Sequence, residues 1–504
     1  MTARGDAARR LWFGAHRAAR RASGVLPGPL RRSARRAREA IVPEQPLEQR
    51  LSPPLGEEDV IELYQRSVLQ QSFYDETYAV DLLAASPIAH DDLARALVQH
   101  LAPASALDVG CGLGELVAKL RARDVEAVGC DFSEAFLRLA PRRARPHLRQ
   151  ADVTALPYPD HAFDVVTCME LLEHLPVPTI DRAIESLRRV TGGTLIVTTP
   201  SFGPDGDRRH GLPINEPSWW EDARENRPFR RIVVGPDGLP DCGHLTLATF
   251  RWWTERFLRH GLARNTDLEL ALLDEGARPL RRHGWSLYAL HEVRSPEFVV
   301  DETDRRQGGG GFGPPVEGPD GRRGRFTGAR ASLHLRPEPG WGRAALALSV
   351  WAGPVTLAHD RRLDVTVEPG LPDEGAAPVR ASFRVRPGGW RELTVPDVPV
   401  DGGILKVSLE TDLTTLPPRL TPKGPVAEPA VGICLARAAL VPTGDRVAVD
   451  PEAQRLGPPV LETPELRLVG VERRRGAAEL TVAVTATPEL EALAAEAARH
   501  GAPL

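Results

Sequence analysis

The sequence has few cysteines, almost no lysine and no long apolar run. Its five cysteines are an odd number without metal-type CxxC spacing, so they indicate neither a disulfide framework nor a zinc site. Only three lysines occur among the 64 basic residues, a bias typical of a GC-rich coding genome. The apolar stretches fall well below the roughly 18 to 20 residues that a membrane span needs, and the N-terminus lacks the apolar core of a secretory signal. We therefore expect a cytoplasmic protein.

The basic and acidic residues nearly balance, 64 against 68, so no field of the whole protein attracts nucleic acid or an anionic membrane. Residues 1–40 are an exception, because eleven arginines face only Asp6 and Glu39 there. We expect residues 1–54 to form an Arg-rich, disordered arm. The alternative is a peripheral contact of this arm with acidic lipid at a membrane surface, or with nucleic acid.

A chain of 504 residues exceeds the roughly 250 to 300 residues at which a single core stops growing, so several domains are expected. After a helical lead-in at 58–102, short β-type runs alternate with helical ones, which predicts an α/β domain over 55–300 with a Rossmann-like, doubly wound, seven-stranded sheet. A Pro/Gly-rich insertion at about 200–243 is long enough for a substrate lid, and a helix is expected at 249–260. The expected strands are 106–109, 126–130, 147–153, 163–169, 193–199, 268–273 and 286–293.

The composition changes at 301–324, where a Gly/Pro-rich stretch predicts a linker. Alternation with period two follows, which favours a β-sandwich-like domain over 325–445. The C-terminal extension, 446–504, contains short strands and a final helical run. The alternating segments are 363–367, 383–385, 393–395 and 405–409 in the domain, and 466–471 and 479–484 in the extension.

The strongest motif is a strand that ends in three glycines spaced two apart, Gly110, Gly112 and Gly114, and opens directly into a helix. Glycines at the carboxyl end of a first strand let a ligand lie against the backbone, where α/β sheets bind their ligands. The pattern alone is weak, because a phosphate loop or a plain tight turn would look similar.

Two aspartates follow at the ends of the next two strands. Asp131 lies about twenty residues past the glycine loop, where a carboxylate can accept hydrogen bonds from both hydroxyls of a ribose. Asp152 ends the third strand, in position to meet an adenine amino group. Either aspartate alone could be a helix N-cap or a turn residue. Together with the glycine loop they favour a nucleoside-binding sheet.

With these features, the chain resembles the class I S-adenosylmethionine methyltransferases. The stretch Phe163-Asp-Val-Val-Thr-Cys-Met-Glu-Leu-Leu-Glu-His-Leu-Pro176 is similar to the corresponding stretch of the ubiquinone-biosynthesis O-methyltransferases. The match is good over 100–200 and looser to 295, and it leaves out the arm and the β-rich domain. A dinucleotide oxidoreductase is disfavoured because the loop lacks GxGxxG spacing.

The resemblance implies S-adenosylmethionine as the cofactor and assigns residues to its parts. The glycine loop would line the methionine end, the second strand would bind the ribose and adenine, the third strand the adenine edge, and the fourth strand would lie below the sulfonium. In that order the residues are Asp108, Gly110, Cys111, Gly112 and Gly114, then Asp131 and Phe132, then Asp152 and Val153, then Met169 and Glu170.

Methyl transfer requires alignment of a nucleophile and removal of its proton, so the catalytic candidates are the histidines His174 and His244. In an alternative role, Glu170, Glu173 and His174 stand at i, i+3 and i+4, and His244 could complete a set of metal ligands. A similar set of two glutamates and two histidines binds a divalent metal in small-RNA 2′-O-methyltransferases. The sequence leaves this metal undecided.

Aromatic pairs in the chain have two interpretations. Trp219 and Trp220, in the insertion, are candidates for acceptor binding or for packing, whereas Trp252 and Trp253 on a helix favour core packing. In the β-rich domain, Trp341, Trp351 and Trp390 could stack on sugars, but buried sandwich aromatics are commoner.

We therefore expect a methyltransferase that transfers to an oxygen of a small molecule, a lipid-linked precursor or a glycan. One alternative is a methyltransferase acting on nucleic acid, which the Arg-rich arm favours. Another is a cofactor-binding scaffold without catalysis, whose β-rich domain binds a glycan or a protein.

Overall fold

A computed structural model describes residues 50–66, 90–203, 212, 214–235, 238–240, 243–275, 285–300, 309–353, 359–372, 376–400, 403–415, 430–443, 462–463, 466–474 and 477–484. The predictions for residues 1–49 of the arm and for the final helical run lie outside these residues. The chain divides into two compact units, which meet in sequence at Val293 and Arg294 and again at Gly310 and Gly311. Each unit is described by itself.

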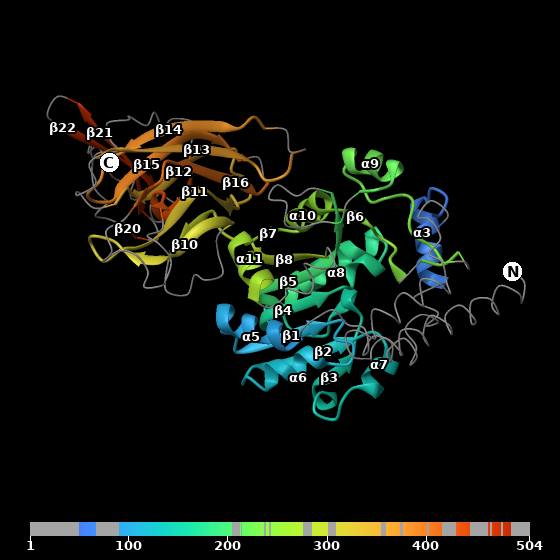
Figure 1. Cartoon of the computed structure of the whole chain (residues 1–504). Helices are drawn as coiled ribbons and strands as arrows, with labels where there is room; N and C mark the ends of the chain where they lie inside the picture. The colour runs from blue at the N-terminus through green and yellow to red at the C-terminus, as the bar shows by residue number, and fades with distance from the viewer. Residues whose placement is uncertain are drawn as a thin grey trace, which may run out of the picture. The chain divides into compact units, whose positions relative to one another are not determined.

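The first unit is built on a mixed sheet with the strand order β3-β2-β1-β4-β5-β8-β7, and a short strand β6 pairs with the end of β5 (Figure 1). Strands β1 to β5 are parallel, and β8 is antiparallel to both of its neighbours. The predicted Rossmann-like fold is confirmed, with seven strands in the main order of the sheet and β6 as an eighth. The strands are β1 (Ser105–Val109), β2 (Glu126–Asp131), β3 (Leu148–Gln150), β4 (Phe163–Met169), β5 (Thr191–Phe202), β6 (Ala248–Thr249), β7 (Leu262–Arg264) and β8 (Trp285–Glu292).

Helices cover both faces of this sheet because successive strand residues point to opposite sides. Ile196 of β5 joins a core cluster with α5, α6 and α11, whereas Val197 joins a cluster with α8 and α10. Helix α8 shows why such segments are helical, since Ile180, Ile184 and Leu187 recur on one face and are fully buried. The helices are α3 (Glu57–Tyr64), α5 (His90–Leu101), α6 (Glu115–Arg121), α7 (Glu134–Leu139), α8 (Val177–Val190), α9 (Pro217–Arg224), α10 (Phe250–Arg259) and α11 (Thr266–Glu275).

The strand predicted at 268–273 is wrong, because this segment belongs to helix α11. The Asn265 side chain accepts a hydrogen bond from the Leu268 backbone N–H at 3.1 Å, which satisfies a free donor at the helix start. Leu268 and Leu272 lie one helical turn apart and are both buried in the cluster that contains α5. The sheet strand after α10 is β7 instead.

The second unit contains an antiparallel sheet with the order β14-β13-β16-β11-β19-β12-β15, with β10 paired to β11 and β9 paired to β19. Side chains from both the middle and the two end strands share one buried core cluster, so the β-rich domain is confirmed. The strands are β9 (Glu297–Val299), β10 (Gly310–Glu317), β11 (Arg323–Leu335), β12 (Arg343–Trp351), β13 (Arg361–Pro369), β14 (Val379–Val385), β15 (Arg391–Pro399), β16 (Leu405–Thr411) and β19 (Cys434–Pro442).

Two boundaries differ from the sequence prediction. Strand β10 occupies residues 310–317 of the predicted linker, where Pro314 and Pro315 are tolerated because β10 pairs on one side only. Strand β9 pairs with β19, so it belongs to the second unit although the first was expected to extend to residue 300.

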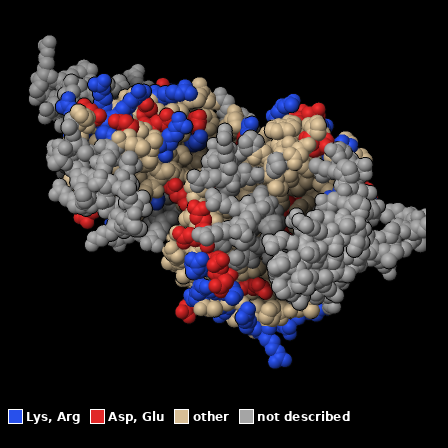
Figure 2. All heavy atoms as spheres, in the orientation of Figure 1, with Lys and Arg blue, Asp and Glu red and all other residues tan. Residues whose placement is uncertain are grey.

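Short strands also pair outside the main sheets. Strands β17 (Thr414–Thr415) and β18 (Ala430–Val431) form a ladder, and β20 (Glu462–Thr463), β21 (Leu466–Arg474) and β22 (Ala477–Val484) form a three-stranded sheet in the C-terminal extension. No helix among the described residues is long and apolar enough to span a membrane. Basic and acidic side chains are interspersed on the face drawn in Figure 2, in line with their near-equal numbers.

Candidate functional site

The glycine loop connects β1 to α6 by a backbone path that suits glycine. Gly110, Gly112 and Gly114 all have positive φ, at 72°, 52° and 72°. A side chain at Gly110 would place its Cβ 2.5 Å from Leu171 Cδ1, so another residue there would be strained and would have to displace the end of the Leu171 side chain. The N–H groups of Gly110 and Cys111 both donate to the Cys130 carbonyl, at 2.8 and 3.0 Å, which holds the loop against the end of β2.

Asp131 ties the glycine loop to the second strand. One carboxylate oxygen accepts from the Gly112 N–H at 2.9 Å, and the other accepts from the Ser133 N–H at 2.8 Å. Burial raises the pKa of Asp131 to about 6, although both backbone hydrogen bonds oppose the rise. Each oxygen retains a second lone pair that could accept from a ligand hydroxyl. The predicted ribose-binding carboxylate therefore lies at the glycine loop.

Asp108, the predicted residue at the methionine end, is buried near the end of β1. Its carboxylate accepts a hydrogen bond from the Thr167 hydroxyl of β4 at 2.7 Å. Burial raises the pKa of Asp108 to about 7, with the Asp131 charge as a smaller cause in the same direction. A buried carboxylate with one donor is poised to interact with a cation.

The other predicted cofactor residues lie at the same edge of the sheet in different settings. Phe132 is among the exposed large apolar side chains, whereas Val153 is buried and Met169 is half-buried. Asp152 caps the short helix Val153–Ala155, because its carboxylate accepts from the Thr154 N–H and hydroxyl, both at 2.8 Å. Asp152 thus has the capping contact that its sequence position also allowed, and it remains exposed.

Glu170 and Glu173 bring two carboxylates together just past β4. Glu173 is fully buried, and Glu170 has a left-handed backbone with φ of 53°. Burial raises the pKa of Glu170 to about 7. Burial also raises the pKa of Glu173 well above its usual value, with the Glu170 charge as the second cause. Both Glu173 oxygens and one Glu170 oxygen are buried without a hydrogen-bond partner among the described residues. Such an arrangement calls for a proton or a cation.

His174 and His244 meet beside Glu173 although they are distant in sequence. Their ring centroids lie 5.0 Å apart, and ligand atoms of Glu173, His174 and His244 all lie within 4.8 Å of one another. His174 Nδ1 lies 3.1 Å from the Gly243 carbonyl oxygen and donates to it. Burial lowers the pKa of His174 to about 3 and that of His244 to about 4.

These residues fit a divalent metal. Neutral imidazole is the form of histidine that binds metals, and a metal-bound histidine usually donates its other N–H to a carbonyl or carboxylate. The Glu173 carboxylate, which is buried and has no hydrogen bond of good geometry to the described residues, is a suitable anionic ligand. The two low pKa values keep both histidines neutral at neutral pH, which is the form that ligates a metal, and the general-base role predicted for them stays a prediction.

Residues 50–64 and the described residues of 214–246 lie together next to this site, and these two segments are called the cover. The Glu173 carbonyl accepts from the Leu245 and Thr246 N–H groups at 2.8 and 2.9 Å. Farther along, the Ser52 N–H donates to the Ile232 carbonyl at 2.9 Å and the Leu55 N–H donates to the Arg230 carbonyl at 2.8 Å. The two segments are therefore joined into one layer.

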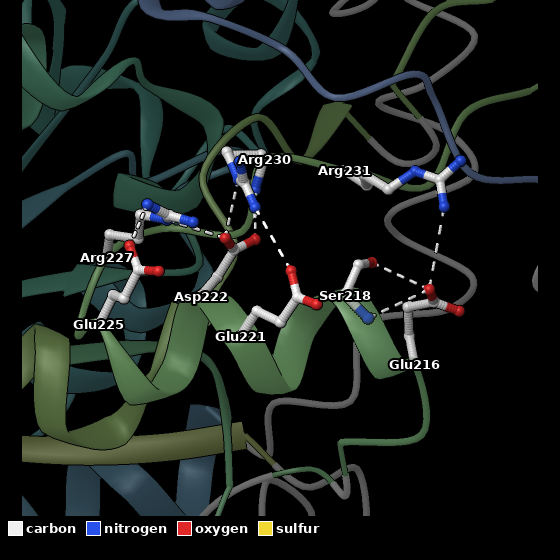
Figure 3. Close-up of polar contacts among 8 residues, drawn as sticks. All are labelled: Glu216, Ser218, Glu221, Asp222, Glu225, Arg227, Arg230 and Arg231. Carbon is white, nitrogen blue, oxygen red and sulfur yellow. Dashed lines mark hydrogen bonds and ion pairs between the residues drawn. The ribbon is translucent and has the colours of Figure 1, made fainter.

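The buried Asp222 side chain on α9 holds the segment at Arg230 whose backbone is hydrogen-bonded to residues 52–55 (Figure 3). Its carboxylate accepts from Arg227 Nε at 2.8 Å, and from both Nε and the backbone N–H of Arg230 at 2.9 Å. Glu216 accepts from the Ser218 hydroxyl at 2.9 Å and pairs with Arg231 at 3.9 Å. These contacts set the path of the cover from α9 to the segment that pairs with residues 52–55.

Most of the tryptophans singled out in the sequence are buried and pack in the core, and Trp220 is the exposed exception among those described below. Trp219 is buried, stacks on Phe229 and donates to the Arg231 carbonyl, whereas Trp220 is 42% exposed. Trp252 and Trp253 are core residues of α10, as predicted. Trp351 is buried and donates to the Gly388 carbonyl, so its ring is not presented to a sugar.

Comparisons with known proteins agree with this geometry. Residues 106–192 match the family model described as "Methyltransferase domain". The ubiquinone biosynthesis O-methyltransferase of Marinobacter nauticus is 38% identical over 113 residues, which are 21% of this chain and 47% of the relative. That of Methylococcus capsulatus is 39% identical over 105 residues, 20% and 44% of the two chains. Residues 106–192 are a class I S-adenosylmethionine methyltransferase segment.

The chain spans less than half of the length of these two relatives. Among solved structures, the 1,6-didemethyltoxoflavin-N1-methyltransferase of Burkholderia thailandensis, with bound 1,6-didemethyltoxoflavin and S-adenosylhomocysteine, is 14% identical. Its TM-score is 0.31, over 48% of this chain and 93% of that one. The family match lies within the first unit.

Proposed function

We propose that this chain is an S-adenosylmethionine-dependent methyltransferase that acts on an oxygen atom of a small molecule, a lipid-linked precursor or a glycan. The observation that carries the proposal is the glycine loop after β1, whose three glycines have positive φ and whose Gly112 N–H donates to the Asp131 carboxylate. The oxygen is supported by the likeness of the segment to the ubiquinone biosynthesis O-methyltransferases.

In this proposal the chain's residues divide the work by position. Asp131 accepts hydrogen bonds from the ribose hydroxyls, and Asp108 stabilises the cationic methionine end of the cofactor. The glycine loop lets the cofactor lie against the backbone. The cover that joins residues 50–64 to the insertion excludes water from the acceptor, since it bonds directly to the Glu173 carbonyl.

Glu173, His174 and His244 would hold a divalent cation, with Glu170 beside them. Such a cation, when bound, supplies Lewis-acid stabilisation to the deprotonated oxygen of an acceptor. The residues themselves fix its place: the Gly243 carbonyl orients the His174 ring, and the buried Glu173 carboxylate contributes negative charge in a site of low polarity.

The proposal is tested by incubating the purified chain with methyl-labelled S-adenosylmethionine and separated pools of small molecules, lipids, glycans and nucleic acids. Label is expected as a methyl ether in one of the first three pools and is expected to vanish with Asp131→Ala. Label in the nucleic-acid pool alone would favour the nucleic-acid alternative. Tight cofactor binding with no label in any pool would favour a scaffold.

A further inference from the structure

A group of buried polar atoms at the edge of the sheet has no hydrogen-bond partner among the described residues. The group lies where β4 and β5 end and β8 begins, and buried polar groups without a partner are rare unless an ion, water or ligand completes them. Its members are Glu170 Oε1, both carboxylate oxygens of Glu173, Thr198 Oγ1, Thr199 Oγ1 and Ser286 Oγ.

Two consecutive threonines of β5, Thr198 and Thr199, each place a hydroxyl near one of the two carboxylates. The Thr198 hydroxyl lies close enough to Glu170 to lower its pKa, and the Thr199 hydroxyl does the same to Glu173, although no hydrogen bond of good geometry joins either pair. Successive strand residues point to opposite faces of a sheet, so the two hydroxyls approach the carboxylates from different sides. Thr199 is the neighbour of the carboxylate that lies with His174 and His244.

Ser286 extends this arrangement across the sheet. It stands directly opposite Thr199 in the antiparallel pairing of β5 with β8. Opposite residues of such a pair share a face, with Cβ atoms about 4.5 to 5.5 Å apart. The next hydroxyl along that face of β8, that of Tyr288, is already occupied, because it lies 2.8 Å from the Ser201 hydroxyl. Thr199 and Ser286 are thus two buried hydroxyls on one face of the sheet without a hydrogen-bond partner among the described residues. The Thr199 hydroxyl lies near Glu173, and the Ser286 hydroxyl lies between Thr199 and the Tyr288 hydroxyl, whose pKa it lowers.

We infer that Thr199 and Ser286 are positioning residues for the cation site, whose hydroxyls orient the Glu173 carboxylate and a water molecule beside it toward the metal. The inference rests on the proposed function. A carboxylate that gives one oxygen to a metal needs a donor for the other, and bulk water does not reach Glu173, which is fully buried. Thr199 supplies that donor, and Ser286 is placed to hold the water that links them.

The test is titration of the whole chain with Mn²⁺ by calorimetry and with Co²⁺ by visible absorption. Thr199→Val removes the hydroxyl and is expected to weaken Mn²⁺ binding about 10- to 100-fold, the range for loss of an outer-shell partner, and to change the Co²⁺ spectrum. Thr199→Ser is expected to restore both. Thr194→Val, at a buried threonine nearer the start of β5, is the matched control and should bind both ions as the wild type does.

A purely structural role makes a different prediction. If Thr199 only filled space, Thr199→Val would bind Mn²⁺ as tightly as the wild type, and that result overturns the inference. The inference also predicts a result without metal. When the metal is removed with a chelator, Thr199→Val should have a higher Tm than the wild type, because the variant no longer buries a hydroxyl without a hydrogen-bond partner. Wild-type protein that binds no Mn²⁺ would overturn the cation site and this inference together, whereas S-adenosylhomocysteine binding would still test the methyltransferase proposal.

Discussion

Replacing Asp108 by asparagine is expected to change how stability depends on pH. The pKa of Asp108 is raised from its ordinary value of 3.8 to about 7 in the fold, mainly by burial. The folded chain therefore holds this proton more tightly than the unfolded chain, and stability falls as pH rises from about 4 to above 7. At about 1.4 kcal/mol for each pKa unit, the raised pKa lowers the stability, relative to its low-pH value, by about 4 kcal/mol at pH 8 and about 2 kcal/mol at pH 5.

The variant lacks this titration, while its amide oxygen can still accept from the Thr167 hydroxyl. Its stability relative to the wild type should thus rise by about 2 to 3 kcal/mol between pH 5 and pH 8, whatever constant offset the amide introduces. Urea unfolding of both proteins at several pH values measures this directly. Thr167→Val removes the hydrogen bond that favours the ionised form of Asp108 and so raises its folded pKa. In this variant the loss of stability should continue to a higher pH than in the wild type. A difference in stability that stays constant from pH 5 to pH 8 would show that the pKa of Asp108 is not raised by the fold.

Three further predictions concern the loop and the cover. Gly110→Ala should destabilise the first unit by about 2 kcal/mol or more, because it adds a contact with Leu171 to the backbone strain. The control is Gly238→Ala, at a glycine with the same φ of 72° but no atom within 4 Å of the new Cβ, which should cost only the backbone strain of about 1 to 2 kcal/mol. Equal unfolding free energies of the two variants would contradict the contact with Leu171. Asp131→Ala should weaken S-adenosylhomocysteine binding about 10- to 100-fold in calorimetry, because it removes a charged acceptor, and unchanged affinity would place the ribose elsewhere. Asp222→Ala should cost about 1 to 3 kcal/mol and speed amide hydrogen exchange at Leu55, and exchange at the wild-type rate would show that the cover does not depend on this carboxylate.

The sequence predicted the first unit well because its signals are local. A glycine loop, a run of β-branched residues and an amphipathic helix such as α8 each reflect the geometry of neighbouring residues. The error at 268–273 came from an apolar run too short to distinguish strand from helix. There the cap from Asn265, together with packing on α5, decides for a helix.

The site was only partly predictable, for a physical reason. Glu173 and His174 share a short helical segment, so their proximity follows from spacing, but His244 reaches them only through the path of the cover. Thr199 and Ser286 meet through the register between β5 and β8, which no sequence motif records. The signal available was two consecutive threonines at the carboxyl end of an apolar strand, where side chains meet ligands. Of the predicted cofactor residues, Asp108 and Asp131 lie next to the loop, whereas Asp152 is occupied as a cap.

The central claim is that the glycine loop holds the nucleoside cofactor. It is tested most directly by calorimetric titration of the whole chain with S-adenosylhomocysteine, beside a Gly110→Arg variant whose fold is verified by circular dichroism. About one molecule should bind per chain in the wild type and none in the variant, because the arginine side chain must displace Leu171 and disrupts the loop that is proposed to hold the cofactor. A folded wild-type chain that binds no S-adenosylhomocysteine, or a folded variant that binds it equally well, would show that the glycine loop does not hold the nucleoside cofactor.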